Sequence, residues 1–150
     1  MLMAARAVTR ATEAIRPRLS GSGIPTLGRV VIGTVFGDIH DIGKNLVAMF
    51  LRGAGFEVFD LGTNLPSDRF VTAVREHDPD IVGISALVTT TTPEMQPVIA
   101  ALDSAALLSQ VKVIVGGAPV TQRFAAQIGA DGYAPDGGAA IKLCRKLLEK

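Results

Sequence analysis

Short hydrophobic runs alternate with amphipathic segments along most of the chain. The continuous β-branched run from Val30 to Phe36 predicts a strand that is buried on both faces. Four shorter runs predict further strands, at 57–60, 81–85, 111–115 and 131–133. The intervening segments have the length and spacing of helices, at 43–54, 67–77, 92–108, 121–128 and 138–148. Gly55 is expected to end the first helix, Ser67 to cap the second, and Pro93 to stand in the first turn of the third.

This order of elements predicts an α/β fold. Repeated strand–helix units with short connections give a parallel sheet with helices on both faces. We therefore expect a doubly wound, five-stranded parallel sheet of the flavodoxin-like kind, with strand order 2-1-3-4-5. Ligands of such sheets bind beyond the carboxyl ends of the strands. The loops that follow strands are expected along one edge, at 37–43, 85–93, 116–119 and 134–138.

The first 27 residues have a different composition. An Ala- and Arg-rich segment with helical spacing reaches Pro17, and the Gly/Ser/Pro stretch from Ser20 to Pro25 is typical of a linker. We predict two regions: a helix and linker at 1–27, and one globular domain at 28–150.

Composition and charge exclude several classes of partner. Lys and Arg number 15, and Asp and Glu number 14, so a formal charge of +1 gives no reason to expect nucleic acid or an anionic membrane. The sequence has no uninterrupted apolar run of about 18 residues and no secretory signal, so we expect a cytoplasmic protein. Cys144 is the one cysteine, which excludes an internal disulfide.

The loop after the first strand carries the clearest candidate chemistry. It reads Gly-Asp-Ile-His-Asp-Ile-Gly-Lys-Asn over residues 37–45. Neutral imidazole is a common transition-metal ligand, and a ligating histidine usually donates its other ring N–H to a carboxylate. Asp38 is well placed to accept from His40, with Asp41 as the competitor. Gly37 and Gly43 allow close approach of something bulky.

A histidine in such a loop is also often only exposed or hydrogen-bonded. One histidine cannot make a zinc site, which needs about four protein ligands, or three plus water. Cys144 and His77 have no ligand spacing to His40. A metal at His40 would therefore arrive already held by an organic macrocycle.

The loop resembles a known family. Asp38-x-His40-x-x-Gly43, within the longer 37–45 string, is similar to the cobalamin-binding signature of methyltransferase corrinoid proteins and of the cobalamin module of methionine synthase. The resemblance covers residues 28–150 and continues at 60–62, 82–87, 114–119 and 132–136.

The resemblance implies cobalamin as cofactor and a role for three residues. Cobalamin would bind with its own benzimidazole displaced from cobalt, and His40 would be the lower axial ligand. Asp38 would hydrogen-bond His40, and Thr91, where relatives often carry serine, would continue a proton relay.

The resemblance also implies a larger set of cofactor contacts, with the displaced nucleotide tail in a slot between sheet and helices. The implied cofactor-binding residues are Gly37, Asp38, Ile39, His40, Asp41, Gly43, Ser85, Leu87, Thr89, Gly116, Gly117 and Gly137. Taken alone, Gly83 and Gly116 could be simple turn residues, and the threonines at 89–92 could form a solvated loop that caps a helix.

The implied function is a corrinoid carrier that holds a methyl–cobalt group for transfer between methyltransferase partners, rather than a complete enzyme. A reductive activase is a further expected partner. Residues 1–27 resemble the last helix and linker of a helical bundle that precedes this domain in the family. Through that helix the chain could also form a homo-oligomer.

Three other functions are compatible with the fold. Carbon-skeleton mutases share the Asp-x-His-x-x-Gly core but usually read Asp-Gly-His-Asp-Arg-Gly, whereas Ile39 and the string at 42–45 favour the methyltransferases. A cobalamin-based light or redox sensor often carries a DNA-binding module, which is missing here. A flavin or phosphoacceptor module would need a phosphate cradle or a carboxylate cluster with a downstream lysine.

Overall fold

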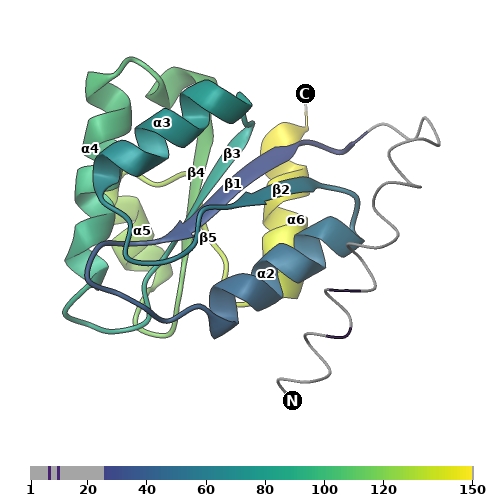
Figure 1. Cartoon of the computed structure of the whole chain (residues 1–150), viewed down its shortest axis with the longest axis horizontal. Coiled ribbons are helices and arrows are strands. Elements are labelled where there is room, and N and C mark those ends of the chain that lie inside the picture. The colour runs from purple at the N-terminus through teal and green to yellow at the C-terminus, as the bar shows by residue number, and fades with distance from the viewer. Residues whose placement is uncertain (1–6, 8–9, 11–25, 150) are drawn as a thin grey trace.

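A computed structural model describes Ala7, Arg10 and residues 26–149. The predicted N-terminal helix and linker therefore lie almost wholly outside the described residues. Five parallel strands form one sheet in the order β2-β1-β3-β4-β5, which confirms the predicted fold class and strand order (Figure 1). The strands are β1 (Arg29–Thr34), β2 (Glu57–Asp60), β3 (Ile81–Ser85), β4 (Lys112–Gly116) and β5 (Gly132–Tyr133).

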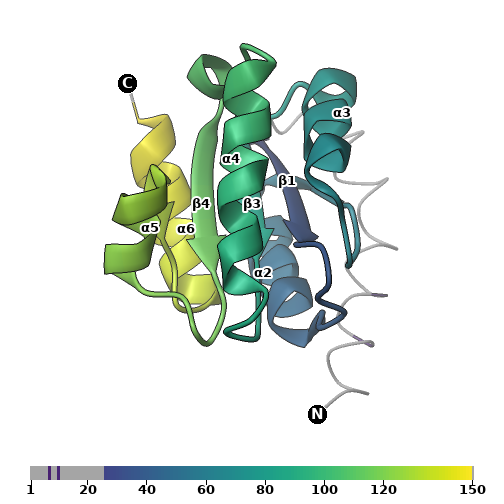
Figure 2. The ribbon, with the colours of Figure 1, turned by 90° about the vertical axis from the view of Figure 1, so that its left-hand side faces the viewer.

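Helices cover both faces of the sheet. One face carries α2 (Ile42–Gly53) and α6 (Gly137–Leu148). The other carries α3 (Ser67–His77), α4 (Met95–Ser104) and α5 (Gln122–Ile128), with α4 crossing in front of β3 and β4 in Figure 2. Two short 3₁₀ helices are η1 (Thr92–Glu94), before α4, and η2 (Leu108–Gln110), before β4. No helix in the described residues is long and apolar enough to cross a membrane.

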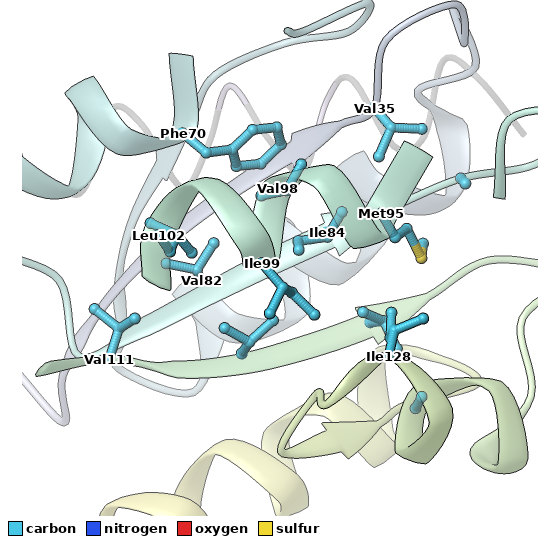
Figure 3. Close-up of a cluster of buried hydrophobic side chains, with 14 of the residues drawn as sticks. Val35, Phe70, Val82, Ile84, Met95, Val98, Ile99, Leu102, Val111 and Ile128 are labelled. Carbon is cyan, nitrogen blue, oxygen red and sulfur yellow. The ribbon is translucent and has the colours of Figure 1, made fainter. Parts of the chain in front are cut away.

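Large apolar side chains fill the α3–α4–α5 face. Phe70 from α3 and Met95 and Leu102 from α4 are fully buried (Figure 3). They pack against the strand residues that point to this side, which include Val82 and Ile84. These side chains form one hydrophobic core on this face.

The α2–α6 face is packed at one end only. Near the amino ends of the strands, Val30, Ile81 and Leu51 are completely buried. Toward the carboxyl ends, small residues appear on this face: Gly83 lies between Ile32 and Ile114, and Ser85 pairs with Gly116. Small side chains there leave space between the sheet and the two helices.

The helix predicted at 92–108 is shorter in the structure, where α4 ends at Ser104. Ala106 adopts a left-handed conformation with φ of 58°. Its N–H donates to Asp103 O at 2.9 Å, and Leu107 N–H donates to Leu102 O at 2.9 Å. These two bonds form a Schellman motif, which usually has glycine at the left-handed position. Because alanine rather than glycine stands at position 106, the sequence pattern did not indicate that the helix ends here.

Other boundaries also differ, and those of α2, β4, α5, β5 and α6 are shifted by one residue from the predicted ones. Ser67 was expected to cap α3, but it is the first helical residue, and Pro66 occupies the cap position without a side-chain bond. The first strand was expected to reach Phe36, but β1 ends at Thr34, and only an isolated bridge between Val35 and Leu65 continues the pairing. The bounds predicted for β2 and β3 are confirmed.

Candidate functional site

Four loops meet at the carboxyl edge of the sheet, as the sequence predicted, and surround a cavity of about 640 Å³. The cavity lies between the sheet and the pair α2 and α6. Its walls come from β1, α2, β3, β4, α6 and the connecting loops: Ile32, His40, Gly43, Lys44, Leu46, Val47, Phe50, Gly83, Ile84, Ser85, Leu87, Ile114, Val115, Gly116, Gly117, Ala118, Ala134, Pro135, Asp136, Gly137, Gly138 and Ala140.

A tight turn directs the chain out of β1 toward this cavity. Asp38 N–H donates to Val35 O at 3.2 Å, which closes a four-residue turn. Gly37 occupies its third position with φ of +80°, the conformation that a type II turn requires there. The residue that follows this glycine, Asp38, is buried, with 1% of its surface exposed.

Asp38 and His40 form the most constrained contact of the site. Asp38 Oδ1 lies 2.8 Å from His40 Nδ1 and also accepts the backbone N–H of His40 at 3.0 Å. Asp38 Oδ2 accepts the N–H of Leu87 at 2.8 Å and the hydroxyl of Thr91 at 2.7 Å. Asp38, rather than its competitor Asp41, therefore contacts the imidazole.

These donors fix the charge of Asp38. Burial alone would raise the pKa of the carboxyl group. The hydrogen bonds from Leu87 N, the Thr91 hydroxyl, and the backbone and ring of His40 outweigh burial and hold the pKa of Asp38 far below its usual range. An ionised carboxylate can only accept, so the neutral imidazole carries its proton on Nδ1 and leaves Nε2 with a free electron pair.

The backbone of His40 is also held. The hydroxyl of Thr34, a completely buried residue at the end of β1, donates to His40 O at 3.1 Å. The imidazole itself is 48% exposed and lines the cavity. The site thus combines a fixed ring with an accessible face.

A buried lysine ties the start of α2 to the end of β2. Lys44 is 4% exposed, and its Nζ donates to both carboxylate oxygens of Asp60 at 2.6 and 2.7 Å and to Asn45 Oδ1 at 2.7 Å. All three ammonium protons are thus used inside the protein. Lys44 therefore links α2 to β2 beside the cavity, and its ammonium group has no donor left for a ligand.

Apolar side chains around His40 are unusually exposed. Ile39 is 75% exposed, and Ile42, Leu46, Phe50 and Leu87 are between 39% and 61% exposed. Leu46, Phe50 and Leu87 line the cavity together with His40, and an exposed apolar lining of this kind usually marks a binding site. Phe50 also rests on α6, because a Cβ at Gly137 would meet its ring at 2.6 Å.

The structure brings most of the predicted site residues together. Those that line the cavity are His40, Gly43, Ser85, Leu87, Gly116, Gly117 and Gly137. Asp38 bonds both His40 and Thr91 and does not line the cavity. The predicted residues that are on the same loops but outside the lining are Thr91, Gly37, Ile39, Asp41 and Thr89. Gly117 has a φ of +129°, and a Cβ there would lie 1.8 Å from Ala86 O, so only glycine fits at this position.

Sequence reasoning missed several contributors. Leu46, Val47 and Phe50 share one side of α2 at helical spacing, a pattern that could have been read as a cavity wall. Thr34 bonds the backbone of His40 within the same turn region, and Lys44 bonds Asp60 at the end of the next strand. No local sequence pattern indicates either contact.

Comparison with known proteins identifies the fold's family. The family described as "B12 binding domain" matches residues 28–142. This chain belongs to the B12-binding domain family. Its membership confirms the predicted family resemblance and the predicted cofactor, cobalamin.

Relatives of this B12-binding domain include corrinoid proteins. Dimethylamine corrinoid protein 1 of Methanosarcina acetivorans is 44% identical over 149 residues, which are 99% of this chain and 70% of the relative. A cobalamin-binding protein from Desulfitobacterium hafniense DCB-2 has a similar structure, with a TM-score of 0.81, 33% identity, and coverage of 97% of this chain and 68% of the other.

A structure solved as a complex is also similar. A chain of the methanol:cobalamin methyltransferase complex of Methanosarcina barkeri matches with a TM-score of 0.78 and 29% identity, over 99% of this chain and 62% of the other. The flavodoxin-like arrangement of this B12-binding domain is therefore shared with proteins of methyltransferase systems.

Proposed function

We propose that this chain is a corrinoid carrier of a methyltransferase system, with His40 as the lower axial ligand of cobalamin and the cofactor's own benzimidazole displaced. One observation carries the proposal: His40 Nδ1 is bonded at 2.8 Å to the buried carboxylate of Asp38, at the rim of the cavity. Because Nδ1 is engaged, Nε2 is the nitrogen left for a metal.

The residues around the cavity fit the cofactor. A volume of about 640 Å³ is in the range of small-molecule sites. Gly83, Ser85 and Gly116 give the cavity a floor without large side chains, so an aromatic base can lie close to backbone. In the described part of the chain, no three His, Cys, Asp or Glu residues gather as a metal site. His40 would therefore be a lone protein ligand to a metal that a macrocycle already holds.

Each residue of the polar chain has a defined task. Cobalamin, when bound, supplies a cobalt that accepts a methyl group from one protein and gives it to another. Asp38 would keep the proton on Nδ1 and strengthen His40 as a donor, and the Thr91 hydroxyl would hold the carboxylate in place.

The remaining contacts predicted from the sequence are part of this proposal. We assign contacts with the corrin ring to the loop that carries His40. We assign contacts with the nucleotide tail to Ser85, Thr89, Gly116, Gly117 and Gly137. Of these five, Thr89 has the weakest support, because it is exposed and does not line the cavity.

The partners proposed are methyltransferases that deliver and accept the methyl group. Support comes from the similarity to a dimethylamine corrinoid protein and to a chain of a methanol:cobalamin methyltransferase complex. A reductive activase and a homo-oligomer through the N-terminal helix stay predictions, and the latter concerns residues outside the described chain.

Substitution of the proposed ligand tests the assignment. His40→Ala should lower the affinity for hydroxocobalamin by at least about tenfold and abolish the protein-induced change in the visible spectrum, because the lower ligand is lost. His77→Ala removes the other histidine, which stacks on Phe59 away from the cavity, and should leave both readouts unchanged. Equal affinity and equal spectra for His40→Ala and the parent would reject His40 as the ligand.

A further inference from the structure

Asn64 bonds twice to the loop that carries His40, although it belongs to a different part of the chain. It lies between β2 and α3 and does not line the cavity. Its Oδ1 accepts the N–H of Gly37 at 2.8 Å, and its backbone N–H donates to Asp38 O at 2.9 Å. The two residues that Asn64 holds are the last two of the type II turn.

The backbone of Asn64 is in an uncommon conformation. Its φ is +54°, in the left-handed region that residues with a Cβ rarely adopt. Asparagine tolerates this region better than most residues, because its short amide can hydrogen-bond nearby backbone. Here the amide bonds the turn of another loop rather than its own backbone.

The segment around Asn64 is fixed on both sides. Gly62 O accepts the N–H of Thr34 at 3.0 Å, and Leu65 N–H donates to Thr34 O at 3.1 Å. Asp60, which is clamped by Lys44, also accepts the N–H of Gly62 at 2.9 Å. The 61–65 segment therefore runs beside the end of β1 as a rigid support for the turn.

We propose that Asn64 is a positioning residue that holds the Val35–Asp38 turn in register, so that Asp38 can orient the imidazole of His40. The inference rests on the proposed function, in which that imidazole binds cobalt. Four donors converge on the Asp38 carboxylate, so a small displacement of its backbone would lengthen several bonds at once. Gly37 is the residue of the turn with a positive φ, and Asn64 is the side chain that accepts its N–H.

Three variants separate this role from general stability. Asn64→Gly keeps the left-handed backbone without strain but loses the acceptor for Gly37. Asn64→Asp keeps an acceptor oxygen at the same place. Asp78→Gly is the matched control, because Asp78 also has a left-handed backbone, with φ of 47°, but caps the far end of α3.

Amide hydrogen exchange in the cofactor-free protein gives the first readout. Asn64→Gly should speed exchange at Gly37 by roughly tenfold, since its hydrogen bond is lost, while the midpoint of urea unfolding stays nearly unchanged. Asn64→Asp and Asp78→Gly should match the parent within about twofold. Unchanged exchange at Gly37 in Asn64→Gly would overturn the inference, whatever the cofactor does.

Electron paramagnetic resonance of protein loaded with cob(II)alamin gives the second readout. The ratio of histidine-ligated to unligated cobalt should fall by about threefold to tenfold in Asn64→Gly and recover in Asn64→Asp. If the parent itself has no histidine ligation, the proposed function fails, and the exchange experiment alone decides the role of Asn64. If the parent is ligated and Asn64→Gly is ligated equally, the positioning role fails.

Discussion

The two faces of the sheet use alternate residues of the same strands for different purposes. Val82 and Ile84 of β3 point to the α3–α4–α5 face, where they pack in one cluster with the buried side chains of Phe70, Met95 and Leu102. Gly83 and Ser85, the residues between and after them, point to the α2–α6 face and line the cavity. A strand alternates sides at every residue, so a single segment can support the core with one set of side chains and leave room for a ligand with the other.

This contrast predicts that substitutions on the two faces act on different properties. On the filled face, truncation should reduce the free energy of unfolding and leave the affinity of the folded protein for cobalamin intact. On the hollow face, enlargement should reduce affinity and leave unfolding nearly unchanged.

The largest expected effect is on the filled face. Phe70 is completely buried, and its ring lies over Gly33, where an added Cβ would be 3.1 Å from Cζ. Phe70→Ala should lower the free energy of unfolding by about 3–5 kcal/mol, measured by urea denaturation of the cofactor-free protein. Phe70→Leu should cost about 1 kcal/mol and keep cobalamin affinity within twofold of the parent. A loss below about 1 kcal/mol for Phe70→Ala would show that this face is not closely packed.

The next effect is on the hollow face. Ser85→Leu fills the cavity floor and should weaken cobalamin binding by roughly thirtyfold, about 2 kcal/mol, because the nucleotide tail loses its space. Cobinamide, which lacks the tail, is the matched ligand and should bind parent and variant with similar affinity. Calorimetric titration measures both. An equal loss for the two ligands would mean that the cavity does not hold the tail.

A smaller effect is expected on the free energy of unfolding in acid, through Asp38 at the carboxyl edge of the sheet. The pKa of Asp38 is held below its ordinary value of 3.8, so in acid the unfolded chain takes up a proton that the folded chain does not. Its stabilising contribution is complete above that value and is lost as the pH falls toward the folded pKa. Asp38→Asn should therefore be less stable than the parent at pH 7. The difference should shrink by up to about 1.4 kcal/mol per pH unit below pH 4.

Urea denaturation of the cofactor-free parent and of Asp38→Asn between pH 2 and 7 checks this pH dependence. Asp41→Asn is the control, because Asp41 begins α2 without a side-chain cap bond. Parallel curves for the parent and Asp38→Asn would contradict the role of Asp38 as a buried, ionised acceptor.

Local patterns explain what the sequence could predict. The short hydrophobic segments at 57–60 and 81–85 predicted β2 and β3 with correct bounds. The alternation of strands and helices predicted the sheet order and the shared edge of the four loops. The string at 37–45 located the candidate site because its chemistry is local: Asp38 is two residues from His40.

The rest depended on contacts between distant segments. Asn64, between β2 and α3, and Thr34, at the end of β1, both bond to the loop of His40, and the sequence around each is ordinary. The end of α4 was not predicted because Ala106 adopts the left-handed conformation that glycine usually adopts after a helix. The cavity itself was only implied, because its depth depends on how α2 and α6 pack, with Phe50 resting on Gly137.

The most direct test of the central claim is the electron paramagnetic resonance spectrum of cob(II)alamin bound to protein whose histidine rings carry nitrogen-15. The unpaired electron on cobalt couples to the nitrogen of the lower ligand, so nitrogen-14 gives triplets and nitrogen-15 gives doublets. With His40 beneath cobalt, labelling the protein should convert triplets into doublets, and His77→Ala should behave identically. Triplets that persist in the labelled protein would show that benzimidazole is still the ligand and would contradict the account.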